Sequence, residues 1–174
     1  MIKAGIFFGS DTGNTENVAY LIEQNSRNDF SIFDIAKSNK ADLEKYNNLI
    51  LGIPTWYYGE VQCDWDDFIP SLKKIDFYNK KVAIFGCGDQ EDYAEYFCDA
   101  MGIIHNIVVS QGATVIGYWS NQGYHFELSK GLLNEKYFVG LAIDQDRQPE
   151  LTIPRIKNWV NQIHDEFLIN TKKV

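Results

Sequence analysis

Short apolar runs alternate along this chain with stretches in which apolar residues recur every three or four positions. The runs have the length of buried strands and occupy residues 2–8, 30–35, 48–53, 81–86, 114–117 and 138–143. Helical spacing of apolar residues is found at residues 17–22, 63–73, 94–108 and 152–167. Strands that alternate with helices indicate a parallel sheet with right-handed crossover connections.

This pattern predicts one α/β domain over residues 1–174, with a doubly wound five-stranded parallel sheet in the strand order 2-1-3-4-5. The segment from Tyr118 to Tyr137 has no strong period and lies between the last two apolar runs. We expect it to be a long insertion that interrupts the fifth strand and packs against it. Thr152 is expected to cap the last helix, with Pro154 in the first turn.

The overall charge narrows the choice of partners. The chain has 174 residues and a formal charge of −8 at pH 7, from 16 basic and 24 acidic side chains. This balance argues against nucleic-acid binding and against anionic membrane surfaces, and it suits a basic protein partner. The apolar runs are much shorter than a membrane span, and because Met1-Ile2-Lys3 leads directly into the first strand we expect no signal peptide. We expect a cytoplasmic monomer.

The cysteines and histidines form no disulfide or metal pattern. Cys63, Cys87 and Cys98 are odd in number and lack C-x-x-C spacing, which indicates reduced thiols. The three histidines show no ligand spacing, so we predict no metal site.

Residues 9–15 connect the first strand to the first helix and are rich in glycine and hydroxyl side chains. They are Gly9, Ser10, Asp11, Thr12, Gly13, Asn14 and Thr15. Unpaired N–H groups at a helix N-terminus, next to conformationally free glycines, favour an anion. The loop contains no Lys or Arg, so a phosphate there would be held by neutral donors alone.

Other interpretations compete with a phosphate site in this loop. A P-loop needs G-x-x-x-x-G-K-[ST], but Gly13 comes one position too early and Asn14 stands after it. Asp11-Thr12-Gly13 matches the aspartic-protease triplet, but three residues recur by chance and a helix follows here. The plainest alternative is a turn in which Thr12 or Thr15 caps the helix.

Two further loops should converge with this one, because doubly wound sheets bind ligands at the carboxyl ends of the strands, where the strand order reverses. Residues 54–59 carry Trp56, Tyr57 and Tyr58, and residues 87–93 carry Tyr93. Aromatic side chains on surface loops are best explained by a flat ring that they cover. A phosphate site beside them predicts FMN rather than ATP, since the magnesium and lysine equipment for ATP is missing.

Neither a dinucleotide site nor a receiver domain fits these loops. Gly86-Cys87-Gly88 is followed by Glu91 where a dinucleotide fingerprint has its third glycine, and an acidic loop would repel a pyrophosphate. A receiver domain needs a phosphoacceptor aspartate after the third strand, where Pro54 and Thr55 stand.

The three loops together resemble those of bacterial long-chain flavodoxins. Ser10-Asp11-Thr12-Gly13-Asn14-Thr15 is similar to the phosphate loop of that family. Pro54-Thr55-Trp56 and Gly86-Cys87-Gly88-Asp89-Gln90 through Tyr93 are similar to its ring-contacting loops, and Ile143-Asp144-Gln145-Asp146 to its segment near the ribityl chain. The insertion before Tyr137 is typical of long-chain members, and the resemblance covers essentially the whole chain. Flavodoxins are themselves a standard example of this strand order, so the topology is not independent support.

The resemblance implies non-covalently bound FMN and a role for each loop. Hydroxyl and amide groups of residues 10–15 would hold the phosphate, and Trp56 and Tyr93 would cover the two ring faces. Gly88 and Asp89 would meet the polar ring edge, and Asp146 the ribityl chain. The complete predicted cofactor-binding set is Ser10, Asp11, Thr12, Gly13, Asn14, Thr15, Pro54, Thr55, Trp56, Tyr57, Tyr58, Gly59, Gly88, Asp89, Tyr93 and Asp146.

The resemblance further implies a low-potential electron carrier rather than an enzyme. It would use the semiquinone/hydroquinone couple of FMN, receiving electrons from an NADPH-dependent flavin reductase and passing them to iron–sulfur or radical enzymes. The alternatives are an FMN-dependent NAD(P)H:quinone reductase, which needs an open pocket over the ring, and a cofactor-free interaction module. Acidic residues beside the ring loops would make the reduced flavin a stronger reductant and steer basic partners. These are Asp64, Asp66, Asp67, Asp89, Glu91, Asp92 and Asp146.

One departure from the family concerns the turn after Trp56. Some flavodoxins have glycine beside flavin N5, where a peptide flips on reduction, whereas this chain has Tyr57 and Tyr58. Because a side chain resists positive φ by about 1–2 kcal/mol, we predict a less favoured flip here.

Overall fold

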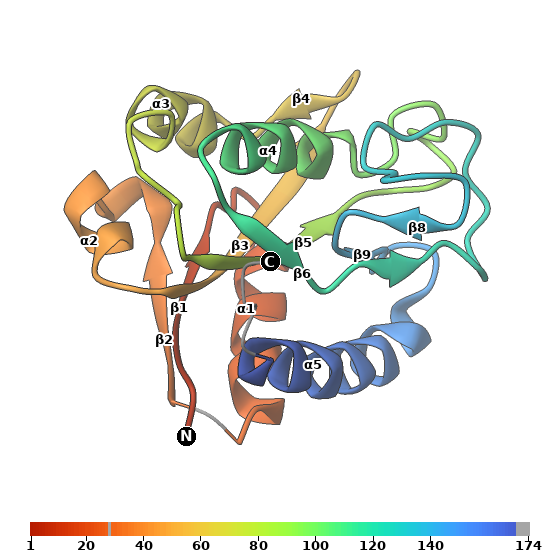
Figure 1. The fold of residues 1–174 in the computed structure, drawn as a ribbon. Coiled ribbons are helices and arrows are strands. Elements are labelled where there is room, and N and C mark those ends of the chain that lie inside the picture. Colours follow the sequence, from red (N-terminus) through yellow and green to blue (C-terminus); the bar gives the residue numbers. More distant parts are fainter. Residues whose placement is uncertain (28, 170–174) are drawn as a thin grey trace.

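The computed structural model describes residues 1–27 and 29–169, so residue 28 and residues 170–174 of the predicted domain lie outside it. A parallel sheet forms its centre and helices cover both faces (Figure 1). The strands are β1 (Lys3–Phe8), β2 (Asp29–Asp34), β3 (Asn48–Trp56), β4 (Glu60–Val61), β5 (Lys81–Cys87), β6 (Thr114–Ile116), β7 (Trp119–Ser120), β8 (Tyr137–Phe138) and β9 (Leu141–Ile143). The helices are α1 (Asn14–Asn25), α2 (Lys40–Glu44), α3 (Cys63–Leu72), α4 (Asp99–Ser110) and α5 (Thr152–Leu168), with 3₁₀ turns at Ile35–Lys37 and Pro149–Leu151.

The sheet has the predicted topology. Its parallel strands run in the order β2-β1-β3-β5-β6, which is the order 2-1-3-4-5 once the short antiparallel strand β4 is left out of the count. β6 pairs with residues 81–83 of β5, and β9 pairs with residues 85–87, so the two short strands occupy one edge position in succession. The chain between them forms the insertion, in which β7 and β8 pair as an antiparallel hairpin. The interrupted fifth strand is therefore confirmed.

The continuous apolar runs reflect burial on both faces of the sheet. Successive side chains of β5 alternate between two cores: Val82 and Ile84 belong to the core that includes residues of α3 and α4, and Ala83 and Phe85 to the core that includes residues of α1 and α5. Figure 1 shows these two pairs of helices on opposite faces of the sheet. This rigid centre fixes where each strand ends, and therefore where the loops meet. Among the described helices, none has both the length and the apolar character needed to cross a bilayer.

The helix predicted to start near residue 94 was placed too early. α4 begins at Asp99, after a left-handed Cys98 with φ of 54°, and residues 90–98 form turns instead. The Asp89 carboxylate accepts the N–H groups of Glu91 (2.9 Å) and Asp92 (3.0 Å), which favours a turn over a helix there. The apolar residue Phe97 packs on Phe126 of the insertion, with ring centroids 5.5 Å apart, rather than on a helical stripe.

The predicted cap of the last helix was also wrong. α5 follows directly from the 3₁₀ turn Pro149–Leu151, Leu151 holds the cap position, and Thr152 is already helical. Its buried hydroxyl has no hydrogen-bond partner, so Thr152 caps nothing.

Candidate functional site

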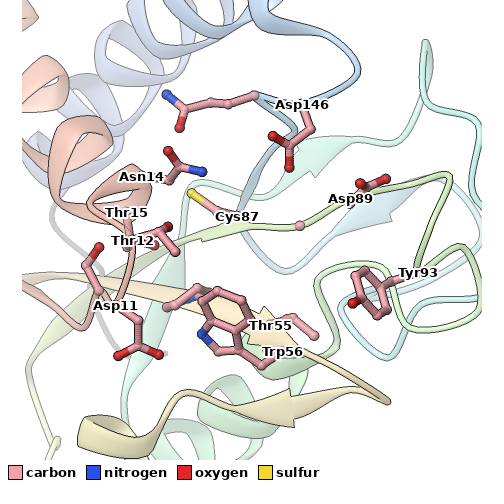
Figure 2. Close-up of a pocket in the computed structure, with 14 residues that line it drawn as sticks. Asp11, Thr12, Asn14, Thr15, Thr55, Trp56, Cys87, Asp89, Tyr93 and Asp146 are labelled. Atoms are coloured by element: carbon pink, nitrogen blue, oxygen red, sulfur yellow. The ribbon is translucent and has the colours of Figure 1, made fainter.

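A cavity opens at the carboxyl ends of β1, β3 and β5, where the strand order reverses (Figure 2). The loops after these strands line it, together with the segment that follows β9. The lining residues are Ser10, Asp11, Thr12, Asn14, Thr15, Pro54, Thr55, Trp56, Cys87, Gly88, Asp89, Tyr93, Gln145 and Asp146. Three loops that lie far apart in the sequence thus meet at one opening, as expected.

The loop after β1 presents its donors at the N-terminus of α1. Gly13 takes the cap position with φ of 90°, where no side-chain cap is present, and the helix begins at Asn14. The Ser10 hydroxyl accepts the Gly13 N–H at 3.0 Å, which closes the turn within the loop. The Thr15 hydroxyl is buried and has no hydrogen-bond partner. An unpartnered buried hydroxyl at a helix N-terminus is suited to an anion that enters the cavity.

The ring-side loops place two aromatic side chains at the same opening. Trp56 ends β3, and Tyr93 stands on the loop after β5, on the far side of the cavity from Thr12 and Asn14 (Figure 2). Tyr93 is 41% exposed, and the indole Nε1 of Trp56 is buried without a partner. Aromatic faces at one end and neutral donors at the other match a molecule with a flat ring and a phosphate.

Comparison with known proteins agrees with this geometry. The family model described as flavodoxin matches residues 6–159. The chain belongs to the flavodoxin family. It is 64% identical to Flavodoxin 1 of Escherichia coli K12 over 96% of each chain, and 57% identical to the flavodoxin of Haemophilus influenzae over 97% of this chain and 98% of that one. The crystal structure of Fusobacterium nucleatum flavodoxin bound to flavin mononucleotide superposes with a TM-score of 0.91, at 35% identity, covering 95% of this chain and 99% of that one.

Four residues of the predicted set do not line the flavodoxin cavity: Gly13, Tyr57, Tyr58 and Gly59. Tyr57 lines a neighbouring groove instead, with φ of 45°, so its backbone is already in the left-handed region that its side chain disfavours. Tyr58 is 76% exposed and meets the edge of the Tyr96 ring. Gly59, with φ of 86°, closes the turn.

Two lining residues were not predicted as part of the site. The Gln145 side-chain oxygen is buried without a partner, and Cys87 lines the cavity beside Gly88. Burial raises the pKa of the Cys87 thiol to about 12. The thiol is therefore protonated at neutral pH. Cys87 precedes Gly88 and Gln145 precedes Asp146, so their position next to predicted site residues could have indicated them.

Arg147 was not predicted as part of the site, and its positive charge partly offsets the negative charge of the acidic residues beside the cavity. Its guanidinium donates to both oxygens of Asp89 at 3.0 Å and lies 3.3 Å from Glu91 and 2.9 Å from Asp92. Burial raises the pKa of Asp89, but hydrogen bonds from Arg147 and from the N–H groups of Asp92 and Glu91 lower it by more. These three carboxylates were expected to act on the flavin as free charges, and they are partly neutralised.

The loop after β1 is joined to the start of α3 by hydrogen bonds between Gln62 and two carboxylates. Gln62 is fully buried, and its amide nitrogen donates to Asp11 at 2.9 Å and to Asp64 at 2.6 Å. The exposed Cys63 thiol lies beside the same carboxylates. Burial and the charges of Asp64 and Asp11 raise the pKa of Cys63. Gln62 therefore holds one oxygen of each carboxylate in an internal hydrogen bond.

The Gln62 side chain leaves no room for a side chain on Gly9. A Cβ on Gly9 would lie 2.2 Å from Gln62 Oε1 and 2.7 Å from Trp65 Cδ1, both in the buried interior. We expect Gly9→Ala to lower the free energy of unfolding of the apoprotein by about 1–3 kcal/mol, measured by urea denaturation. Gly13→Ala is the comparison, because its Cβ would meet nothing within 4 Å and only the positive φ opposes it. A Gly9→Ala variant as stable as the parent chain would show that Gln62 is free to move.

Proposed function

We propose that this cavity binds FMN non-covalently and that the chain, as one domain, is a low-potential electron carrier. The observation that supports this most is the set of buried polar atoms without partners that line the cavity: the Thr15 hydroxyl, the Trp56 indole N–H and the Gln145 side-chain oxygen. Buried polar atoms are nearly always hydrogen-bonded in folded proteins, so three around one opening point to a polar ligand. Their positions suit the separate parts of FMN.

Each loop would hold one part of the cofactor. The N–H groups at the start of α1, with the side chains of Thr12, Asn14 and Thr15, would bind the phosphate without any cation. Trp56 and Tyr93 would cover the ring, Gly88 and Asp89 would meet its polar edge, and Gln145 and Asp146 would face the ribityl chain. Bound FMN would supply electron transfer in one-electron steps, and the protein would orient it and set its electrostatic surroundings.

The arrangement favours transfer between proteins over turnover of a small substrate. Aromatic side chains on both ring faces would leave only a ring edge accessible, whereas an FMN-dependent NAD(P)H:quinone reductase needs room above the ring. The exposed acidic side chains of Glu60 and Asp66 line the groove on the Trp56 side of the cavity and would attract a basic surface. An NADPH-dependent flavin reductase is the expected donor, and iron–sulfur or radical enzymes are the expected acceptors. The free thiols fit a reducing compartment such as the cytoplasm, and the chain is expected to act as a monomer.

The test begins with the apoprotein and two ligands, FMN and riboflavin. FMN should bind at least about 100-fold more tightly, because riboflavin lacks the phosphate that the loop after β1 would hold. NADPH alone should leave the bound flavin oxidised, and a basic flavin reductase should reduce it at a rate that falls as salt rises. Failure to bind FMN would refute the proposal, and rapid bleaching by NADPH alone would support the quinone reductase instead.

A further inference from the structure

A buried carboxylate, Asp144, immediately precedes the cavity-lining residues Gln145 and Asp146. Asp144 is fully buried, and its two oxygens accept four N–H groups. Oδ2 accepts the backbone N–H of Gln90 at 3.0 Å and the Gln90 side-chain amide at 2.8 Å. Oδ1 accepts the backbone N–H groups of Asp146 at 3.2 Å and Arg147 at 3.0 Å. Charge-assisted hydrogen bonds of this kind are stronger than neutral ones, so Asp144 joins the loop after β5 firmly to the segment after β9.

Gln90 extends this connection to a third segment. Its side chain is only 2% exposed, and its amide oxygen accepts the backbone N–H of His125, which lies in the insertion. The chemistry of the two partners fixes the orientation of the amide, since a carboxylate only accepts and a backbone N–H only donates. Gln90 therefore bridges the insertion and Asp144 through opposite ends of one amide group.

The bridge borders the cavity on two sides. Gln90 follows Asp89 and precedes Tyr93 on the ring-side loop, and Asp144 precedes Gln145 and Asp146. A second hydrogen bond joins the insertion to the segment after β9, because the Gln148 amide donates to the Gly123 carbonyl at 2.8 Å. A displacement of the insertion would therefore move Gln90, and with it the loop that carries Asp89 and Tyr93.

We propose that Gln90 and Asp144 are positioning residues that transmit the placement of the insertion to the FMN site. The insertion, through the His125 N–H, holds the Gln90 amide in place. Asp144 then sets the spacing between the Tyr93 loop and the loop of Gln145 and Asp146. This inference rests on the proposed FMN site, and it gives the insertion a role in cofactor retention beyond filling the edge of the sheet.

The test uses the full chain loaded with FMN and the variant Gln90→Met. Methionine keeps the length and volume of the side chain but removes both ends of the amide bridge. FMN should dissociate about three- to tenfold faster, as expected for the loss of one net hydrogen bond of about 1 kcal/mol. The circular dichroism of the bound flavin should also change, because Tyr93 would no longer sit as closely against the ring. Asp144→Asn is the second variant, since its amide nitrogen would have to face two N–H donors, and it should accelerate FMN release in the same way.

Gln111→Met is the matched control. It makes the same substitution at the C-terminal end of α4, outside the insertion and the cavity lining, where the Gln111 amide donates to the Lys73 and Ile75 carbonyls. The control should lose stability as an apoprotein, yet release FMN at the rate of the parent chain. Equal acceleration in Gln111→Met and Gln90→Met, or release from Gln90→Met within twofold of the parent, would overturn the inference. A parent chain that does not bind FMN would refute the proposed function itself, which separates the two failures.

Discussion

Trp56→Ala should weaken FMN binding by about tenfold to a hundredfold, measured by fluorescence titration of the apoprotein. Covering one ring face removes on the order of 100 Å² of apolar surface from water, which is worth about 2.5 kcal/mol at about 25 cal/mol per Å². Trp56 is only partly buried in the fold, and its indole N–H has no partner within the described residues. The loss should therefore fall mainly on the cofactor and much less on the stability of the apoprotein.

Tyr57→Ala provides the comparison at the adjacent position. Tyr57 is an aromatic residue that is 60% exposed and lines the neighbouring groove, outside the cavity lining. Its removal should change the FMN dissociation constant by less than about threefold. If the two variants lost equal affinity, the turn as a whole would position the ring, and Trp56 would have no special role on its face.

Arg147→Gln should make the potential for the second electron of bound FMN more negative by about 20–60 mV. A unit charge at about 10 Å contributes about 1–2 kcal/mol at an effective dielectric constant of about 20, less when exposed, and about 59 mV corresponds to about 1.4 kcal/mol. Removing the guanidinium would leave Asp89, Glu91 and Asp92 without the cation that they now surround. Their combined field would then oppose a negative charge on the ring more strongly.

Arg147→Lys separates charge from geometry. Lysine keeps the positive charge but cannot form the two parallel hydrogen bonds to Asp89. Its potential should stay close to that of the parent chain, while FMN release becomes faster because the loop is held less firmly. A redox titration that gives the same shift for both variants would contradict the role of charge compensation.

The sheet and the place where the three loops meet could be predicted from the sequence because both depend on local signals. The apolar run at residues 48–53 indicated a strand buried on both faces, and the hydroxyl-rich turn at residues 9–15 indicated a helix N-terminus. Strand ends in such a sheet meet at one edge, so the three loops could be brought together without coordinates.

The misplaced start of α4 shows where local signals fail. Phe97 and Cys98 have helical spacing relative to Met101, but Phe97 packs on the insertion and Cys98 adopts a left-handed backbone. Arg147 and Asp89 lie 58 positions apart, and Gln90 and Asp144 lie 54 apart. Contacts between residues so far apart leave no periodic pattern in the sequence, so neither the Arg147–Asp89 ion pair nor the Gln90–Asp144 bridge was predictable.

The exposed thiol of Cys63 makes this chain convenient for spectroscopy. Cys87 and Cys98 are buried, and burial raises both of their pKa values, so a maleimide dye should attach at Cys63 without any substitution. The label would stand beside Asp11, in a groove that Trp56 also lines, so we expect its fluorescence to change when flavin binds. Because the pKa of Cys63 is itself raised, coupling should be slow at pH 7 and faster in mildly alkaline buffer. A dye on Cys63 could therefore report cofactor binding and partner binding without an introduced cysteine.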